Sequence, residues 1–293
     1  MRLSIWPGTA QPYSDILAVA RHAAGTGWDG VWAADHFMPN RPVGERPETP
    51  MLEAGTVVAA LGASVDRVTV GTLVYGNTYR HPAVLANMAA TADHVSGGRF
   101  VLGVGAGWQV NEHQQYGIDL PPVTPLLDRF EEALQVLHGL LRTPVTTFTG
   151  EYYQLTGAVC EPKPVQTPLP IMIGAKGEQR MLRMVARYAD QWNTWGLPDL
   201  IAHKSAVLDD HCDAVGRDPK TILRTAQALI SLDDTRPTNP DVAFYGGSTD
   251  AVRATVEQYR EIGLGELIIP DALLGTGATR LKNMDTIFSL VRD

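Results

Sequence analysis

The sequence predicts an α/β fold of the (β/α)8 or TIM-barrel class, and three observations carry this prediction. Short apolar or β-branched runs alternate with segments of helical periodicity along the whole chain of 293 residues, which is typical of repeated βα units around a parallel sheet. The runs number eight, the count that closes such a barrel. No sequence repeat beyond the βα period and no low-complexity tract divides the chain, so we expect a single domain over residues 1–293.

Each predicted strand is a short run of apolar or β-branched residues. The runs lie at 3–6, 30–34, 68–74, 100–104, 171–173, 191–194, 222–230 and 267–269. The first helix begins at Ser14-Asp15 and ends near Gly27, and Pro82 occupies the first turn of a helix that runs to Val95. Later helices, with apolar residues at three- and four-residue spacing, are predicted at 125–141, 178–188, 200–215, 249–262 and 279–291.

One interval, about 145–170, breaks the alternation between the fourth and fifth βα units. Its first part, from Thr146 to Tyr153, has the pattern of a β-hairpin, and a proline-rich stretch follows. Neither half of the chain has enough strands to close a barrel alone. We therefore interpret the interval as an insertion and not as a domain boundary.

Charge and cysteine content restrict the class of protein. A formal net charge of -8 argues against nucleic acid or an anionic membrane as the main partner, because both favour a basic surface. Cys160 and Cys212 stand far apart with no CxxC or Cys/His spacing, so we predict no zinc site and no disulfide, and we expect a cytoplasmic chain. No apolar stretch approaches about 18 residues and the first residues lack a signal-peptide pattern, so no membrane association is expected. A homodimer is the default oligomer.

The turn after the fourth strand is the first candidate binding site. Gly103, Gly105 and Gly107 bring bare backbone to the carboxyl end of that strand. Glycine lets a flat or anionic ligand approach the main chain, and barrel enzymes bind ligands at this end of their strands. The alternative is a tight βα turn with no ligand. The glycine spacing, without an acidic residue about 20 positions later, argues against a Rossmann nicotinamide site.

Polar residues follow other predicted strands at the same end. The second strand ends at Asp35-His36, a carboxylate beside an imidazole suited to proton transfer, with a structural role for both as the alternative. Arg80 precedes the helix that starts at Pro82 and is a candidate anion site, with a solvated surface position as its alternative. The turn 174–177 opens the helix after the fifth strand and is a candidate phosphate site. No nucleophile elbow, P-loop or metal-ligand spacing is found in the sequence, which disfavours nucleophile and metal chemistry.

A series of motifs runs along the chain in an order that is more specific than any one of them. They are Asp35-His36-Phe37-Met38-Pro39, Gly76-Asn77-Thr78-Tyr79-Arg80-His81-Pro82, Ser96-Gly97-Gly98-Arg99, Gly103-Val104-Gly105-Ala106-Gly107-Trp108, Gly117-Ile118, Glu161-Pro162-Lys163-Pro164-Val165-Gln166 and Gly247-Ser248-Thr249. Together they resemble the bacterial luciferase-like superfamily, and within it the coenzyme F420-dependent oxidoreductases. The resemblance implies a (β/α)8 barrel with an insertion, F420 or FMN at the carboxyl ends of the strands, and hydride transfer between the cofactor ring and a small-molecule substrate.

The resemblance also implies roles for particular residues. Asp35 corresponds to an acid that contacts the ring, and His36 to a rim histidine that gives or takes a proton. Leu73-Val74 corresponds to a non-prolyl cis peptide under the ring. The remaining cofactor-binding residues are Gly105, Ala106 and Gly107 along the ring and ribityl chain, and Gly174, Ala175, Lys176 and Gly177 in the phosphate turn.

One position departs from the family's pattern. Trp108 stands where some deazaflavin dehydrogenases carry a proton-handling glutamate, which argues against oxidation of a sugar phosphate. Glu112 and His113 are candidates for that proton role, with an ordinary position on a helix surface as the alternative for each. Our prediction for the catalytic residues is His36 and Glu112.

The leading functional hypothesis is an F420-dependent oxidoreductase that acts on an unidentified small organic substrate. The alternatives are an FMN-dependent luciferase-like monooxygenase on the same barrel and a non-catalytic flavin-binding protein. A basic track from Arg80 and Lys176 towards Arg41, Arg46 or Arg180 would favour F420, because the F420 tail is longer than the phosphate of FMN and differs from it in charge.

Overall fold

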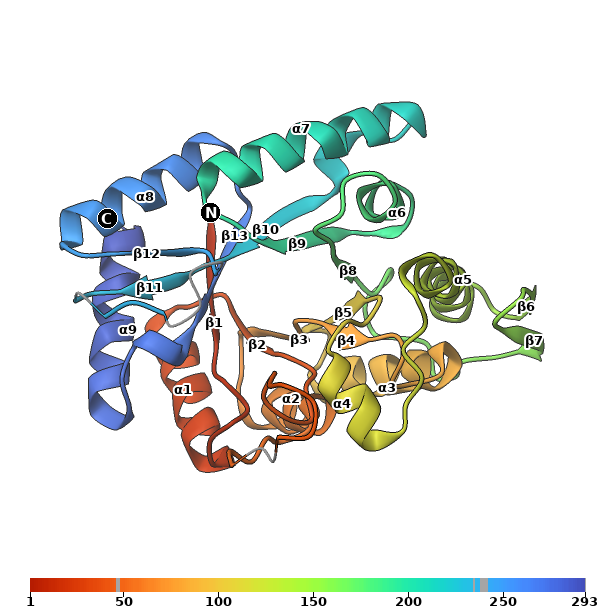
Figure 1. Cartoon of the computed structure of the whole chain (residues 1–293), viewed down its shortest axis with the longest axis horizontal. Coiled ribbons are helices and arrows are strands. Elements are labelled where there is room, and N and C mark those ends of the chain that lie inside the picture. Colours follow the sequence, from red (N-terminus) through yellow and green to blue (C-terminus); the bar gives the residue numbers. More distant parts are fainter. Residues whose placement is uncertain (46–47, 234, 238–241, 293) are drawn as a thin grey trace.

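The computed structural model describes residues 1–45, 48–233, 235–237 and 242–292, and within them a parallel sheet closes into a barrel (Figure 1). Its eight strand positions are β1 (Arg2–Trp6), β2 (Gly30–Ala33), β3 (Thr69–Thr72), β5 (Phe100–Gly105), β8 (Ile171–Gly174), β9 (Gln191–Trp195), β10 (Leu223–Gln227) and β13 (Glu266–Pro270). Their order around the barrel follows the chain, and β13 pairs with β1. The predicted fold class is confirmed, and every predicted strand overlaps a barrel strand.

Helices surround this ring of strands (Figure 1). They are α1 (Tyr13–Thr26), α2 (Ala54–Ser64), α3 (Pro82–Val95), α4 (Val110–Tyr116), α5 (Val123–Arg142), α6 (Met181–Tyr188), α7 (Pro198–Ala214), α8 (Thr249–Glu261) and α9 (Gly277–Arg292), with short 3-10 turns η1 (Pro219–Thr221) and η2 (Asp271–Leu273). α1 ends as predicted at Gly27, whose φ of 96° favours glycine. Within the described ranges, no helix has the length and apolar composition needed to cross a lipid bilayer.

Two helices, α2 and α4, lie outside the predicted set. The sequence of α2 is rich in alanine, glycine and valine, most of them buried, so it carries no polar stripe that would mark a helix by its period. α4 has only seven residues, which is too short for a periodic pattern. α2 leads into β3 and α4 follows β5, and tertiary contacts and not local propensity fix the helical state of both.

The third strand is interrupted at the mouth of the barrel. β3 ends at Thr72, the peptide bond between Leu73 and Val74 is cis, and the short strand β4 (Tyr75–Gly76) continues beside β5. The cis bond confirms the expectation drawn from the family resemblance. Leu73 and Val74 both pack against the apolar cluster inside the barrel.

Two segments leave the barrel. The predicted insertion is confirmed as the antiparallel hairpin of β6 (Thr146–Thr149) and β7 (Gln154–Ala158), which stands beyond α5, outside the ring of helices (Figure 1). The predicted strand at 222–230 is too long, because it divides at Ala228 into β10 and β11 (Leu229–Ser231). β11 pairs with β12 (Phe244–Gly246) and not with a barrel strand, although its apolar residues continue the pattern of β10.

The barrel separates two apolar cores. The larger lies between the strands and the helices, and the smaller, inside the barrel, consists of Trp32, Leu73, Val101, Met172 and Ile268. Successive residues of a strand point to opposite faces and so contribute to one core and then the other. The interior is thus packed with side chains, and the carboxyl ends of the strands remain for ligands.

Candidate active site

A chain of hydrogen bonds joins the loops after β2 and β4 to helix α4, which follows β5. We name its three side chains, His36, Tyr79 and Glu112, the His36 cluster. Nδ1 of His36 lies 2.9 Å from Oε1 of Glu112, and the Tyr79 hydroxyl donates to the same oxygen. The backbone amide of Phe37 donates to Oε2 of Glu112 at 2.8 Å. The Glu112 side chain has 0% of its surface exposed and the His36 side chain has 24%. The two residues predicted to be catalytic are therefore in contact, with His36 on the open side.

The cluster holds Glu112 as a carboxylate. Burial raises its pKa, but hydrogen bonds from His36 and Tyr79, the charge of His36 and the Phe37 amide outweigh burial and leave the pKa below the ordinary value of a glutamate. A carboxylate only accepts hydrogen bonds, so Nδ1 of His36 carries the proton that faces it. Nε2 of His36 makes no hydrogen bond within the described part of the chain, and it is the nitrogen left to exchange a proton with a ligand.

His113 has a different environment from His36. Its Nδ1 lies 2.6 Å from the carbonyl oxygen of Gln109 and its Nε2 lies 2.7 Å from Oγ1 of Thr78. The residue is buried, and both ring nitrogens are used within the protein. His113 thus fastens α4 to the loop after β4. The alternative of an ordinary helix surface is wrong for both Glu112 and His113, because each is almost fully buried.

Trp108 stands beside the His36 cluster. Its ring meets that of His36 edge-on, with 5.5 Å between the ring centroids, and 59% of the residue is exposed. By contrast, Trp28, Trp32 and Trp192 are buried. An exposed indole next to the histidine offers an apolar wall to a ligand and brings no charge.

Asp35 lies next to His36 in the chain but belongs to a separate ion-pair network. Arg80 donates to Oδ2 and Oδ1 of Asp35 at 2.7 and 3.0 Å, and to Oε1 of Glu53 at 2.5 Å. The amide of Gly76, just after the cis peptide, also donates to Asp35 at 3.0 Å. Burial lowers the pKa of Arg80, but the hydrogen bonds to Asp35 and the charges of Asp35 and Glu53 outweigh burial and raise it.

The ion pairs show which of the predicted anion-binding cations are already neutralised by carboxylates. Two carboxylates compensate the single charge of Arg80, so the expectation that it forms an anion site is wrong. Arg180 likewise pairs with Asp128, at 2.5 Å, whereas Lys176 and Arg41 are exposed. Arg46 lies outside the described residues. A continuous basic track through Arg80 and Arg180 is therefore not formed.

The glycines predicted to line the cofactor make room for one side chain. A Cβ added to Gly105 would lie 2.8 Å from Cγ2 of Val74, closer than packed atoms allow, and a Cβ added to Gly174 would lie 3.0 Å from the same atom, a tight contact. Gly107 has a φ of 100°, and a Cβ there would lie 2.7 Å from Oγ1 of Thr78. Val74 is thus seated between the ends of β5 and β8, and no side chain stands up from either strand end.

The turn 174–177 after β8 is anchored from α7. The amide of Ala175 donates to the carbonyl of Asn193 at 2.9 Å, and Nζ of Lys204 donates to the carbonyl of Lys176 and to Oε1 of Glu178, both at 2.8 Å. Lys204 is buried, while the Lys176 side chain is exposed. The turn is therefore fixed in place, and the exposed side chain of Lys176 stands at its tip.

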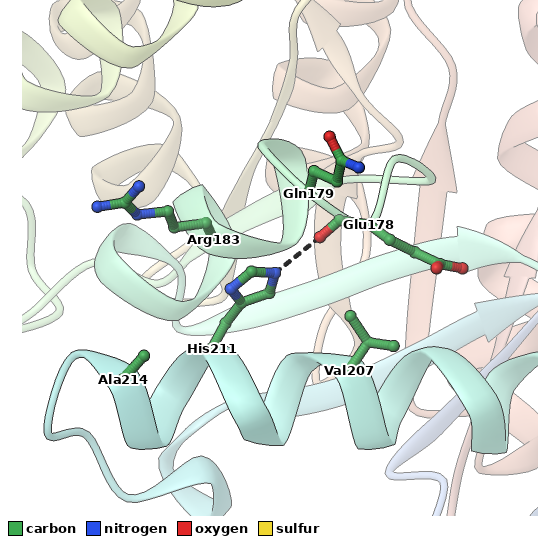
Figure 2. A pocket seen from close by; sticks show the side chains of 6 residues that line it. All are labelled: Glu178, Gln179, Arg183, Val207, His211 and Ala214. Atoms are coloured by element: carbon green, nitrogen blue, oxygen red, sulfur yellow. Dashed lines mark hydrogen bonds between the residues drawn. The ribbon is translucent and has the colours of Figure 1, made fainter.

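Surface hollows near α6 are not this site. One of about 490 Å³ lies between α6 and α7, and Figure 2 shows Arg183 and His211 at its walls, with Nε2 of His211 bonded to the carbonyl of Glu178 at 2.7 Å. A second, of about 280 Å³, lies on the other side of α6 and is also lined by Arg183. Neither is lined by a residue of the His36 cluster. Among the residues described, no group of three or more His, Cys, Asp or Glu side chains is arranged to hold a metal ion.

Sequence reasoning missed Glu53 and Lys204. Glu53 caps α2 by accepting from the amides of Gly55 and Thr56, a pattern that a search for helix starts could have found. Its contact with Arg80 spans 27 residues and has no local signal. In the sequence, Lys204 has the pattern of a polar residue on an amphipathic helix, and no local signal indicates that it is buried.

The chain is similar to known proteins in sequence. An F420-dependent glucose-6-phosphate dehydrogenase of Amycolatopsis mediterranei is 34% identical over 176 residues, which is 60% of this chain and 50% of that protein. The enzyme of the same name from Microbacterium testaceum is 34% identical over 208 residues, 70% of this chain and 60% of that protein. The chain thus spans about half to three fifths of the length of these relatives.

Solved structures share its fold. An F420-dependent secondary alcohol dehydrogenase in complex with an F420-acetone adduct superposes over 100% of both chains, with a TM-score of 0.85 and 20% identity. The coenzyme F420-dependent tetrahydromethanopterin reductase of Methanopyrus kandleri gives a TM-score of 0.82 over 99% of both chains, with 16% identity. The family model for luciferase-like monooxygenases matches residues 1–266, which include the barrel strands from β1 to β10 and every residue of the His36 cluster. By this match the chain belongs to the luciferase-like monooxygenase family.

Proposed function

We propose that the protein is an oxidoreductase that transfers hydride between coenzyme F420 and a small organic substrate, with the accompanying proton handled at Nε2 of His36. The observation that carries this proposal is the contact of His36 with the buried carboxylate of Glu112 at the mouth of the barrel. A histidine held through one nitrogen and partly exposed is arranged for general acid–base work with the other. The names of the sequence relatives support F420 as the cofactor.

The residues present fit a planar cofactor ring. Gly105 and Gly174 keep the floor around Val74 free of side chains, which leaves an apolar surface that a flat ring can cover. Trp6 ends β1 and packs against Trp195, with 5.8 Å between the ring centroids. Its Nε1 is buried without an acceptor among the described residues, and a polar ring edge would satisfy such a donor.

The roles of the other predicted residues follow from their contacts. When bound, the deazaflavin ring supplies the atom that gives or accepts hydride. Lys176 and the backbone of the turn 174–177 would hold the phosphate, and Lys204 keeps that turn in place. Asp35 has both oxygens engaged by Arg80 and Gly76, so we propose that it supports the interrupted strand below the ring and does not contact the ring itself.

The proton step is defined by the His36 cluster. In the oxidation of an alcohol, Nε2 of His36 would take the hydroxyl proton while the carbinol carbon gives its hydride to the bound cofactor, and a carbonyl forms. In the reverse reaction the same nitrogen would return the proton to the carbonyl oxygen while the carbonyl carbon accepts hydride from the reduced cofactor. Glu112 does not reach the substrate, because its side chain is buried behind His36, and it acts by holding Nδ1.

The substrate that fits this mouth is uncharged. Trp108 places an apolar ring beside His36, and the charge of Arg80 is compensated by Asp35 and Glu53. A phosphorylated substrate needs cations for its phosphate group, and within the described ranges no uncompensated cation contacts the His36 cluster. We therefore propose a neutral alcohol or carbonyl compound and not a sugar phosphate.

Fluorescence titration of the purified protein with F420, and separately with FMN, tests the cofactor. We expect saturable binding of F420, and its loss in Gly174→Val, whose side chain would collide with Val74. Gly25→Ala is the matched control, because a Cβ at Gly25 meets nothing within 4 Å. Binding of FMN alone would favour the monooxygenase alternative, and binding of neither would overturn the proposal.

Exchange of hydride with a panel of neutral alcohols and ketones tests the chemistry. His36→Ala should bind F420 normally and lose about 10²- to 10⁴-fold in turnover, since a proton-transfer group acts only during the reaction. An equal loss of affinity and turnover would make His36 a binding residue, and full turnover would remove it from the mechanism.

A further inference from the structure

Tyr79 is the member of the His36 cluster that neither the motifs nor the proposed reaction assigns a role. Its hydroxyl donates to Oε1 of Glu112, the oxygen that also faces Nδ1 of His36. Its ring is fixed on both sides, with centroids 4.9 Å from the ring of Phe37 and 4.8 Å from that of His113. The hydroxyl is therefore aimed at the carboxylate by packing.

Burial and the carboxylate together keep this hydroxyl protonated. Burial raises the pKa of Tyr79, and the hydrogen bond to Glu112 and the charges of Glu112 and Asp35 raise it further. Tyr79 is thus a permanent donor to Glu112 and does not itself exchange a proton with a ligand at neutral pH. Glu112 shares its negative charge among Tyr79, His36 and the Phe37 amide.

The other titratable groups near His36 form ion pairs or hydrogen bonds with other partners. Asp35, next to it in the chain, pairs with Arg80, and Arg80 also binds Glu53. His113, from the same helix as Glu112, uses both ring nitrogens on Thr78 and Gln109. This leaves Glu112 as the charged group in direct contact with His36 among the described residues, and Tyr79 as the side chain that modulates Glu112.

We propose that Tyr79 is a positioning residue that sets the tautomer and the proton affinity of His36 through Glu112, an inference that rests on the proposed role of His36 in proton transfer. A carboxylate that already accepts from Tyr79 has less negative charge to offer to Nδ1. His36 therefore keeps the Nδ1–H tautomer, and its cationic form is stabilised less than by a lone carboxylate.

Under this proposal, two substitutions shift the pH midpoint of His36 in opposite directions. Tyr79→Phe keeps the ring packing and removes one donor from Glu112, so the more basic carboxylate holds the Nδ1 proton more firmly. The pH midpoint of His36 should rise by about 0.5 to 1 unit, a 3- to 10-fold gain in proton affinity. Glu112→Gln removes the charge, so the midpoint should fall by about one unit and the two neutral tautomers should mix.

Nuclear magnetic resonance of protein labelled with ¹⁵N-histidine measures the pH midpoint and the tautomer of His36 without a substrate or cofactor. The signal of His36 is assigned by its absence in His36→Gln, and its two ring nitrogens are followed through a pH titration. Tyr116→Phe is the matched control, because Tyr116 stacks on Phe37, with 5.2 Å between the centroids, and its hydroxyl makes no hydrogen bond within the described ranges. This control should leave the midpoint of His36 unchanged, and the melting temperature of each variant verifies that it folds.

An unchanged or lowered midpoint in Tyr79→Phe, or an equal shift in Tyr116→Phe, would overturn the proposal. These outcomes are separate from failure of the proposed function, which appears as full turnover in His36→Ala. If the midpoints move as expected and His36→Ala still turns over, the cluster sets the ionisation of a histidine that the reaction does not use. If the midpoints do not move and His36→Ala is inactive, Tyr79 has only a packing role.

Discussion

Replacing Arg80 by methionine isolates the ion-pair network that supports the interrupted third strand. The variant removes two charge-assisted hydrogen bonds from Asp35, at 2.7 and 3.0 Å, and leaves that buried carboxylate with only the Gly76 amide. Removing one partner of a buried ion pair costs about 3–5 kcal/mol, because the remaining charge stays buried and uncompensated. For a chain of this size we expect the melting temperature to fall by about 6–15 °C.

The loss should depend on pH. Burial raises the pKa of Asp35, and the bonds from Arg80 and Gly76 offset part of this rise, so removing Arg80 raises the pKa further. A group whose pKa is raised in the folded state adds stability while it is protonated and loses that contribution as pH rises through its folded pKa. The melting temperature of Arg80→Met should therefore fall further below that of the parent protein at pH 8 than at pH 5.

Thermal unfolding at both pH values, with Glu53→Gln as the matched control, measures this effect. The Glu53 side chain is 33% exposed and also caps α2, so loss of its contact with Arg80 and of one capping bond should together cost about 1–2 kcal/mol and leave the Asp35 pair in place. The reasoning is refuted if Arg80→Met is no less stable than Glu53→Gln, or if its loss is the same at pH 5 and pH 8. F420 affinity should fall in Arg80→Met as well. Without Arg80, Asp35 is held less firmly, and the Gly76 amide that it binds lies close in the chain to Val74, the proposed floor under the cofactor ring.

Two further predictions concern other parts of the barrel. Burial and the charge of Arg142 lower the pKa of His138, whose Nε2 lies 2.7 Å from the carbonyl of Tyr188. The protein should therefore lose stability as pH falls below about 6.5, the ordinary pKa of histidine, towards the lower pKa of His138 in the folded state. Urea unfolding at pH 7 and pH 5 measures this loss, which should be smaller in His138→Gln. Lys204→Met should release the turn 174–177 and weaken F420 binding about 10-fold or more, as measured by the same fluorescence titration. Lys220→Met, on an exposed turn, is the control. Equal F420 affinities in the two variants would contradict the anchoring role of Lys204.

The barrel could be predicted because its strands are local patterns. Each is a short apolar run, and the same alternation that buries Leu3 and Ile5 outside the barrel turns Ser4 and Trp6 inward. The pattern failed where two strands in succession share a composition, as at 222–230, because nothing local shows that the chain after Ala228 turns away to pair with β12. It also failed for α2, whose residues are buried and lack a polar face.

For the candidate site, the sequence indicates residue types and not the contacts between them. The His36 and Glu112 side chains stand 76 residues apart, and their contact depends on how the loop after β5 folds back over β2. The charge state of Arg80 could not be read from its neighbours in the chain, since Asp35 and Glu53 lie 45 and 27 residues away. Sequence patterns give the residue types at a strand end, whereas tertiary packing decides which of them are neutralised and which stay open.

The packed interior of the barrel has a consequence for proton exchange at the proposed site. Below the mouth, the cluster of Trp32, Leu73, Val101, Met172 and Ile268 fills the space between the strands, and Ser4 and Trp32 both donate to Glu266 beneath it. If His36 exchanges the proton as proposed, the exposed side of its ring is the side that faces Trp108 and the solvent. A substrate that covers this indole would then also cover the proton exit. Substrate binding and proton exchange with water would alternate.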